Sequence, residues 1–257
     1  MSYETLTLQK KEHIVVITIV NVENDPAKIA RLSDDLSDLC TDITSDSETR
    51  VIILTGAGEN AFSMGTDFLR AVSRMDEGPC KKLWPLAEPI ARLDRPVIAA
   101  INGDAVCQGL ELILACDIRI AVETASFGLP HITKGLIPWD GGTQRLSRLV
   151  GRGKAMEMIL TGEAIDVQEA YRIGLVNRVV RANELMEVAM NIAQEMASRG
   201  PIALRYAKEA IYKGMDLTLE QGLHLEGDLY FLLQTTSDRT EGVTAFREKK
   251  TPRFEGR

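Results

Sequence analysis

The stretch INGDAVCQGLELILACDIRIA, residues 101–121, places a single acid, Glu111, inside a run of apolar side chains. Apart from Glu111, all residues from Leu110 to Cys116 are apolar, which predicts a short helix buried on all sides. Residues 117–122 are predicted to form the strand that follows it. A buried carboxylate is harder to ionise, so its pKa rises toward the range useful for proton transfer. Glu111 is therefore a candidate general base or acid. The alternative is a partly exposed glutamate, stabilised by the dipole at the start of the helix.

Strands and helices alternate on both sides of this stretch. Two β-branched runs at 3–9 and 13–20 predict a hairpin, and a helix capped by Ser33 is expected through 34–43. Further expected elements are a strand at 50–58, a helix across 81–94 and a strand at 95–103. This alternation predicts an α/β fold.

The pattern changes in the last quarter of the chain. From residue 183 nearly to the end it is helical, without strand signals. We therefore expect an α/β core over residues 1–197 and a helical region over 198–257 that packs on the core or on a neighbouring subunit. Apolar side chains in the helical region, among them Leu223, Leu229, Phe231 and Leu232, should be shielded in one of these two ways.

Composition excludes several classes of protein. The 257 residues are 45% hydrophobic and 26% charged, which suits one large domain with or without an appendage. A formal net charge of −7 disfavours nucleic acid as the main partner. No apolar run approaches the ~20 residues of a membrane span, and the first residues lack the apolar stretch of a signal peptide. We expect a cytoplasmic protein without a membrane partner.

The cysteines suggest neither a metal site nor disulfides. Cys40, Cys80, Cys107 and Cys116 form no CxxC pair and have no histidine cluster nearby, so we expect reduced, packed thiols and no bound metal. The glycine-rich TGAGENAFSMGTDF, residues 55–68, has the spacing of neither a phosphate-binding loop nor a dinucleotide fingerprint. Nucleotide hydrolysis and hydride transfer therefore lose support.

A second polar group stands in PHITKGLIPWDGG, residues 130–142. His131 titrates near neutral pH, and Asp140 beside an apolar wall would have a raised pKa, so both are candidates for proton transfer. Each has a plainer alternative: His131 as a hydrogen-bonded loop residue after Pro130, and Asp140 as the cap of a helix beginning near GGTQRL. Trp139 reads as a packing or pocket-wall residue.

Two turns could supply backbone donors to an oxyanion. One is the turn at Met64 and Gly65, and the other is the helix start at Gln108 and Gly109. Together they would hold the carbonyl oxygen of an ester or thioester, although glycine turns after strands are common.

Four ordered blocks carry a resemblance to a known family: AFSMGTD (61–67), INGDAVCQGLELILACDIRIA (101–121), FGLPHITKGLIPWDGGTQRLSRLVG (127–151) and AMEMILTGEAIDVQEAYRIGLVNRVV (155–180). They look like the crotonase superfamily, also called the enoyl-CoA hydratase/isomerase family. The resemblance implies a crotonase-like spiral of ββα repeats, with a C-terminal helical region that forms trimers, often paired into hexamers.

The resemblance also implies an acyl-CoA thioester as substrate, with coenzyme A entering as part of that substrate and no separate cofactor. It assigns the two oxyanion donors to the backbone of Met64 and Gln108, with Gly109 beside the second. The substrate-binding residues that it implies are Ala27, Ile29, Ser63, Gly65, Asp67, Trp139 and Gly141.

The chain departs from the family's hydratases at three places. The first of their two glutamates falls on Glu111, but the second falls on His131. Asp140 stands where those hydratases have a small residue. The family's dienoyl-CoA isomerases, dihydroxynaphthoyl-CoA synthases and chlorobenzoyl-CoA dehalogenases also use an aspartate at this place. The segment PAKIARL, residues 26–32, lacks the asparagine usual in the family's coenzyme loop.

From these residues we expect a lyase that hydrates an enoyl-CoA or dienoyl-CoA, with Glu111 positioning the water and Asp140 or His131 handling the second proton. The substituted second glutamate favours an unusual acyl group, such as the cyclic cyclohexa-1,5-dienecarbonyl-CoA. A double-bond isomerase, a hydrolase or dehalogenase that uses Asp140, and a non-catalytic binding protein of the same fold are the alternatives.

Overall fold

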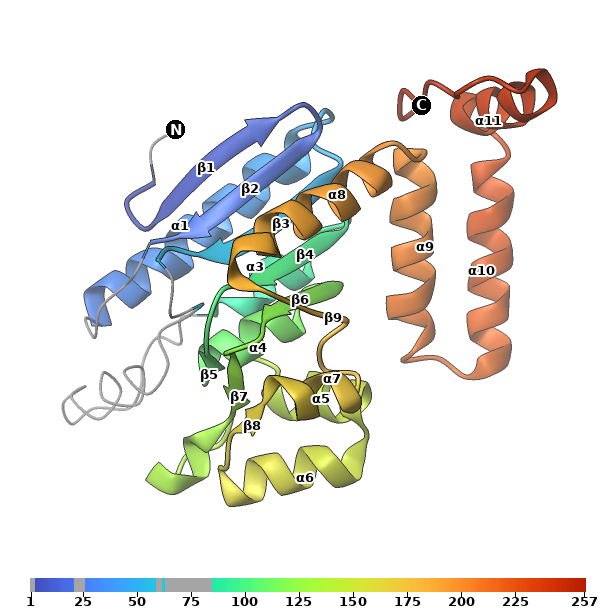
Figure 1. The fold of residues 1–257 in the computed structure, drawn as a ribbon. Coiled ribbons are helices and arrows are strands. Elements are labelled where there is room, and N and C mark those ends of the chain that lie inside the picture. The colour runs from blue at the N-terminus through green and yellow to red at the C-terminus, as the bar shows by residue number, and fades with distance from the viewer. Residues whose placement is uncertain (1–2, 21–25, 59–61, 63–84) are drawn as a thin grey trace.

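A six-stranded sheet forms the centre of the computed structural model, which describes residues 3–20, 26–58, 62 and 85–257, without the side chains of 26 and 27 (Figure 1). Its strand order is β1-β2-β3-β4-β6-β9. The first pair is antiparallel and every later neighbour is parallel. The strands are β1 (Leu6–Lys11), β2 (Ile14–Ile19), β3 (Val51–Gly56), β4 (Val97–Ile101), β6 (Ile118–Val122) and β9 (Arg178–Val180).

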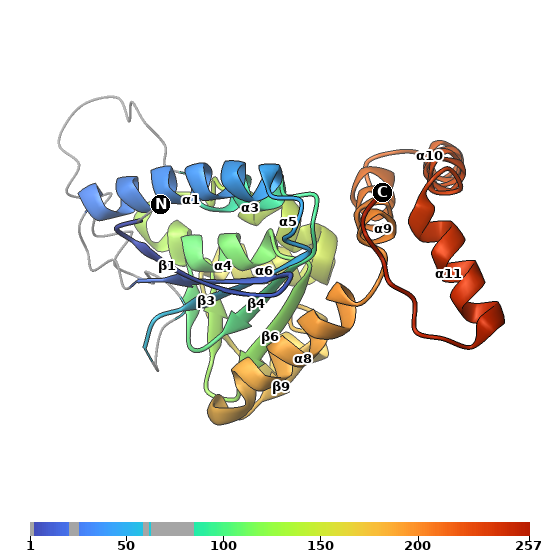
Figure 2. The same ribbon diagram turned by 90° about the horizontal axis from the view of Figure 1, so that it is seen from above.

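The central strands are almost continuously apolar because both faces of the sheet are covered. All residues of β3 and β4 are buried. Helices α1 (Pro26–Ser45), α3 (Ala87–Ala91) and α4 (Gln108–Leu114) lie on one side of the sheet, and α8 (Leu185–Ala197) lies on the other (Figure 2). This layered arrangement confirms the expected α/β class and the hairpin at its start.

A smaller sheet continues the spiral below the first (Figure 1). It has the order β5-β7-β8 and consists of β5 (Ala105–Val106), β7 (Ser126–Gly128) and β8 (Ile165–Asp166). The segments around it are the 3₁₀ turn η1 (Pro130–Lys134), α5 (Gly142–Val150), α6 (Arg152–Thr161) and α7 (Val167–Arg172). The 3₁₀ turn η2 (Ala182–Glu184) lies between β9 and α8. β5 leads directly into α4, so the end of this sheet positions the start of the buried helix.

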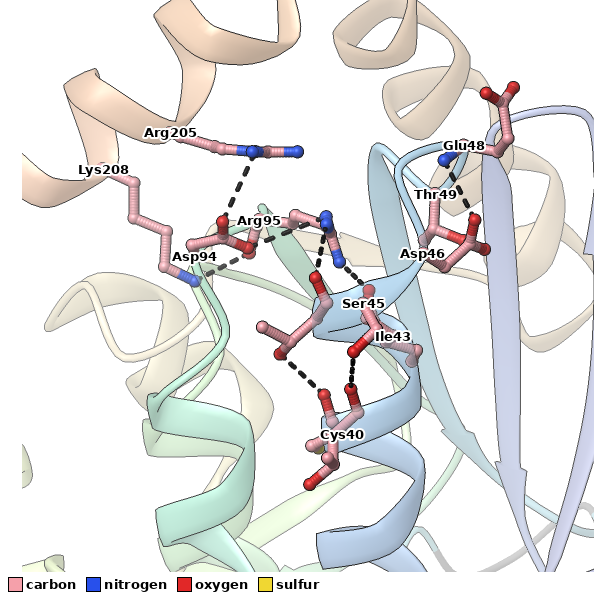
Figure 3. Close-up of polar contacts among 12 residues, drawn as sticks. Cys40, Ile43, Ser45, Asp46, Glu48, Thr49, Asp94, Arg95, Arg205 and Lys208 are labelled. Atoms are coloured by element: carbon pink, nitrogen blue, oxygen red, sulfur yellow. Dashed lines mark hydrogen bonds and ion pairs between the residues drawn. The ribbon is translucent and has the colours of Figure 1, made fainter. Parts of the chain in front are cut away.

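Three helices extend away from the core: α9 (Pro201–Gly214), α10 (Leu219–Leu233) and α11 (Ser237–Glu248). Polar contacts attach α9 to the core near the end of α1 (Figure 3). Lys208 Nζ donates to the carbonyl of Arg95 at 2.8 Å, and Arg205 Nε pairs with Asp94 Oδ2 at 3.4 Å. Arg95 in turn donates to the carbonyl groups of Ile43 and Thr44 in the last turn of α1.

Two expectations about helices were wrong. Ser33 caps no helix, because α1 already begins at Pro26, a residue suited to a first helical position; the Ser33 hydroxyl instead donates to the carbonyl of Pro85 at 3.0 Å. Of the helix expected across 81–94, the described part is α3 alone, with Pro85 and Leu86 before it outside the helix.

Other expectations can be compared with the described residues. Cys40, Cys107 and Cys116 are buried free thiols, as expected, whereas Cys80 lies outside the described residues. The described helices include none with the length and apolar character needed to cross a bilayer. No group of three His, Cys, Asp or Glu side chains within the described ranges is placed to hold a metal ion. The domain boundary at 197/198 stays a prediction.

Candidate active site

Glu111 occupies the interior of α4. The residue before this helix, Cys107, has φ 55° and ψ −127°, a conformation that a residue with a Cβ adopts only under strain. The chain therefore turns sharply from β5 into the helix, and the N–H of Glu111 donates to the carbonyl of Cys107 at 3.1 Å. Glu111 is 0% exposed, which overturns the alternative of a partly exposed glutamate.

The two carboxylate oxygens of Glu111 have different surroundings. Oε1 accepts backbone N–H groups from Asp140 at 2.8 Å and from Gly142 at 3.0 Å. A Cβ at Gly142 would lie 2.9 Å from this oxygen, so only glycine allows so close an approach. Oε2 has no hydrogen-bond partner among the described residues. One oxygen thus anchors the side chain, and the other is left for chemistry.

Burial raises the pKa of Glu111 to about 7, although the N–H bonds from Gly142 and Asp140 work in the opposite direction. A carboxylate with such a pKa both accepts and returns protons near neutral pH. The structure therefore confirms the sequence-based expectation of a buried carboxylate with a raised pKa.

His131 faces the unused oxygen of Glu111. It lies in η1, is 1% exposed, and places Nε2 3.9 Å from Glu111 Oε2. Neither ring nitrogen meets full hydrogen-bond geometry with a described residue, although the backbone of Leu129 lies close enough to act on the ring, so the alternative of a hydrogen-bonded loop histidine stays open. Burial lowers the pKa of His131, and the backbone of Leu129 opposes this effect only in part. The imidazole is therefore neutral at neutral pH.

Asp140 is also buried, at 6% exposure, but its side chain is differently engaged. Its Oδ2 accepts the N–H groups of Leu86 and Ala87, each at 2.7 Å, at the start of α3. The alternative that it caps the helix near GGTQRL was wrong, because the cap of α5 is Gly141, with φ 101° and no side-chain hydrogen bond. Burial raises the pKa of Asp140, against the two N–H bonds.

The other expected site residues are only partly described. Ser63, Met64, Gly65 and Asp67 lie outside the described residues, as does the side chain of Ala27. Ile29 is 1% exposed and belongs to the hydrophobic core, so its side chain faces away from solvent.

The residues nearest Glu111 are described. Gln108 and Gly109 are buried in the first turn of α4. Trp139 is half-buried and packs against the core, in keeping with a wall residue.

Sequence reasoning missed Arg145. Its Nη1 donates to the carbonyl of Asp140 at 2.8 Å, and a Cβ at Gly141 would meet the same nitrogen at 2.1 Å. The paired glycines before TQR were a usable signal, because they mark a close approach of side chains to backbone.

Comparison with known proteins identifies the family of the chain. The chain matches the family described as Enoyl-CoA hydratase/isomerase over residues 9–257. The chain belongs to this family. It is a crotonase-superfamily protein and an enoyl-CoA hydratase-like enzyme.

Individual relatives agree in length and fold. The crotonyl-CoA hydratase of Syntrophomonas wolfei is 38% identical, with 99% of each chain covered. The short-chain-enoyl-CoA hydratase of Clostridium acetobutylicum is 39% identical, with 97% of each covered. The crystal structure of an enoyl-CoA hydratase from Bacillus anthracis is 41% identical and superimposes with a TM-score of 0.84, covering 99% of this chain and all of the other. The crotonase-like spiral expected from the sequence is confirmed.

Proposed function

We propose that this enzyme adds water across the α,β double bond of an enoyl-CoA thioester, with Glu111 transferring the proton and His131 orienting the water. The observation that carries this proposal is the pair of unused atoms, Glu111 Oε2 and His131 Nε2, which face each other at 3.9 Å in a buried site. A water molecule placed about 2.8 Å from each atom would form a hydrogen bond with both.

Glu111 and His131 account for every proton transfer and hydrogen bond of the water in this reaction. The Glu111 carboxylate takes one proton from the water as the water oxygen bonds to the β-carbon of the substrate. The electron pair of the double bond moves to the thioester oxygen and forms an enolate. Protonated Glu111 then returns the proton to the α-carbon, which restores the carboxylate. Neutral His131 accepts the second hydrogen bond of the water and directs its lone pair at the β-carbon.

The enolate oxygen requires preorganised donors. We assign them to the backbone N–H groups of Gln108 and Met64, as the family resemblance implies, with Gly109 beside the first. The buried start of α4 supports the Gln108 assignment, because helix N-termini favour negative charge. Coenzyme A enters as part of the substrate, and no further cofactor takes part in this scheme.

For the acyl group, we propose a cyclic dienoyl-CoA such as cyclohexa-1,5-dienecarbonyl-CoA. The support comes from the residues that differ from the family's hydratases: His131 replaces the second glutamate, and Asp140 replaces a small residue. The remaining proposed substrate contacts are Ala27, Ser63, Gly65, Asp67, Trp139 and Gly141, whereas the side chain of Ile29 lies in the core.

Product analysis tests both proposals. The enzyme is incubated with crotonyl-CoA and with the cyclic dienoyl-CoA, each in ¹⁸O-labelled water and in D₂O, and the products are analysed by mass. Hydration predicts one ¹⁸O atom on the acyl chain. Deuterium without ¹⁸O would identify an isomerase, and ¹⁸O in a free acid would identify a hydrolase; either result contradicts the proposal. Faster turnover of crotonyl-CoA than of the cyclic compound would contradict the proposed acyl group.

We also propose a homotrimer or a pair of trimers, located in the cytoplasm. Large apolar side chains on α9 and α10 support assembly, since Ile211 is 68%, Leu219 81% and Phe231 71% exposed in the single chain. Of the four tail residues expected to be shielded, Leu229 is buried, whereas Leu223, Phe231 and Leu232 are exposed and are not covered by the core.

A further inference from the structure

Asp140 joins three segments around Glu111. Its N–H donates to Glu111 Oε1 at 2.8 Å, its Oδ2 accepts the two N–H groups that begin α3, and its carbonyl accepts from Arg145 of α5 at 2.8 Å. Arg145 also lies 3.6 Å from Glu88 Oε2, in the first turn of α3. The backbone N–H of Asp140 therefore anchors the carboxylate of Glu111, while the side chain of Asp140 holds that backbone in place.

These contacts favour a structural task for the carboxylate of Asp140 over proton transfer. Oδ2 of Asp140 accepts two backbone N–H groups at 2.7 Å, and protonation of this oxygen would weaken both hydrogen bonds. These bonds cap α3, whose own N-cap residue, Leu86, provides no side-chain cap. Glu111 Oε2 and His131 Nε2 differ from Asp140 Oδ2, because they have no hydrogen-bond partner in the described part of the chain.

We propose that Asp140 is a positioning residue: its carboxylate fixes the start of α3 to the loop before α5, and its N–H thereby holds Glu111 in the orientation that presents Oε2 to His131. This inference rests on the proposed hydration by Glu111. It assigns Asp140 a role other than the acid–base role that its place in the family resemblance implies.

The charge of Asp140 has a second consequence. Among the described titratable groups, Arg145 and Glu88 act on the charge of Asp140, and Asp140 acts on Glu111, which His131 faces on its other oxygen. The negative charge on Asp140 disfavours ionisation of Glu111 and adds to the effect of burial. Removal of this charge without loss of the hydrogen bonds should therefore make Glu111 easier to ionise.

Three variants test the proposal, with hydration rates measured from pH 5 to 9. Asp140→Asn keeps an oxygen for the N–H groups of Leu86 and Ala87, so kcat should stay within about fivefold of wild type. The acid limb of its kcat/KM profile should move down by roughly 0.5–1 pH unit. Asp140→Ala removes the acceptor and should lower kcat about 10²-fold while KM changes little. Asp166→Asn, the same change at the exposed cap of α7, is the matched control and should leave rate and profile unchanged.

The activities of these variants distinguish a positioning role of Asp140 from proton transfer. If Asp140→Asn loses activity as completely as Asp140→Ala, Asp140 transfers a proton and the proposal is wrong. An unshifted profile in an active Asp140→Asn variant would refute the effect of the Asp140 charge on Glu111, and the activity of this variant decides between positioning and proton transfer if Asp140→Ala does not fold. Glu111→Gln is assayed in parallel: full activity there would refute hydration through Glu111, whatever the Asp140 variants show.

Discussion

Glu111 and His131 form a buried pair in which the carboxylate Oε2 and the imidazole Nε2 lie 3.9 Å apart and neither has another partner among the described residues. This distance is too long for a direct hydrogen bond and suits two groups that share a small polar molecule. Buried polar atoms are rarely left unpaired, so the pair marks a functional site.

The first prediction concerns Glu111→Gln. Glutamine keeps the shape and its Oε1 still accepts the N–H groups of Asp140 and Gly142, but it cannot take a proton from water. Hydration should fall by about 10²- to 10⁴-fold, the range of general acid–base catalysis. Binding of the CoA thioester, measured by calorimetry, should change little. A variant that retains the wild-type rate would disprove proton transfer by this residue.

The second prediction separates the two tasks in the pair. His131→Gln retains a polar group that can hold water, whereas His131→Ala does not. We expect the alanine variant to lose about 10²-fold in kcat and the glutamine variant to lose less, because orientation needs only a hydrogen bond. Equal, complete loss in both variants, measured with the same substrate, would instead make the imidazole the proton carrier.

The third prediction is a pH profile. The proposed mechanism requires ionised Glu111, whose pKa is about 7, and neutral His131, whose pKa is lowered by burial. The value of kcat/KM should therefore rise with pH to a plateau, with a midpoint near 7 set by Glu111 in the free enzyme. Initial rates at low substrate concentration from pH 5 to 9 test this. A flat profile over that range would show that Glu111 does not control the rate.

The fourth prediction concerns assembly. Phe231 is 71% exposed on α10, and such side chains are normally covered. Light scattering of the wild type should give a multiple of the 28.3 kDa chain mass. Phe231→Asp should weaken the assembly, because a buried unpaired charge is costly, and Phe231→Leu should preserve it. A wild-type mass of one chain at micromolar concentration would refute the proposal.

Local patterns predicted the parts of the fold and site that depend on near neighbours. The apolar residues around Glu111 gave its burial and raised pKa, and the two β-branched runs gave the hairpin of β1 and β2. The task of Asp140 was not predictable in this way, because its partners Leu86 and Ala87 lie 54 and 53 positions away in the chain. The prediction that Ser33 caps a helix was wrong because cap-forming residues also occur inside helices. There their hydroxyl groups form tertiary contacts, such as the hydrogen bond from Ser33 to the carbonyl of Pro85.

The fifth prediction links the charge of Glu111 to stability. The pKa of its carboxyl is raised from 4.5, the value expected for the unfolded chain, to about 7 in the folded protein. Between these values the folded state binds more protons, so the contribution of Glu111 is most favourable below pH 4.5 and is lost as pH rises through 7. By linkage the loss is on the order of 3 kcal/mol in the free energy of unfolding.

Glu111→Gln removes this titration while preserving the hydrogen bonds of Oε1. The melting temperature of the variant should therefore exceed that of the wild type at pH 8.5, and the difference should shrink toward zero as pH falls below 5. Thermal unfolding of both proteins at one concentration measures it, since any assembly then contributes equally. Glu187→Gln, at an exposed position on α8, controls for a general change in net charge. A difference that is independent of pH would show that burial does not raise the pKa of Glu111.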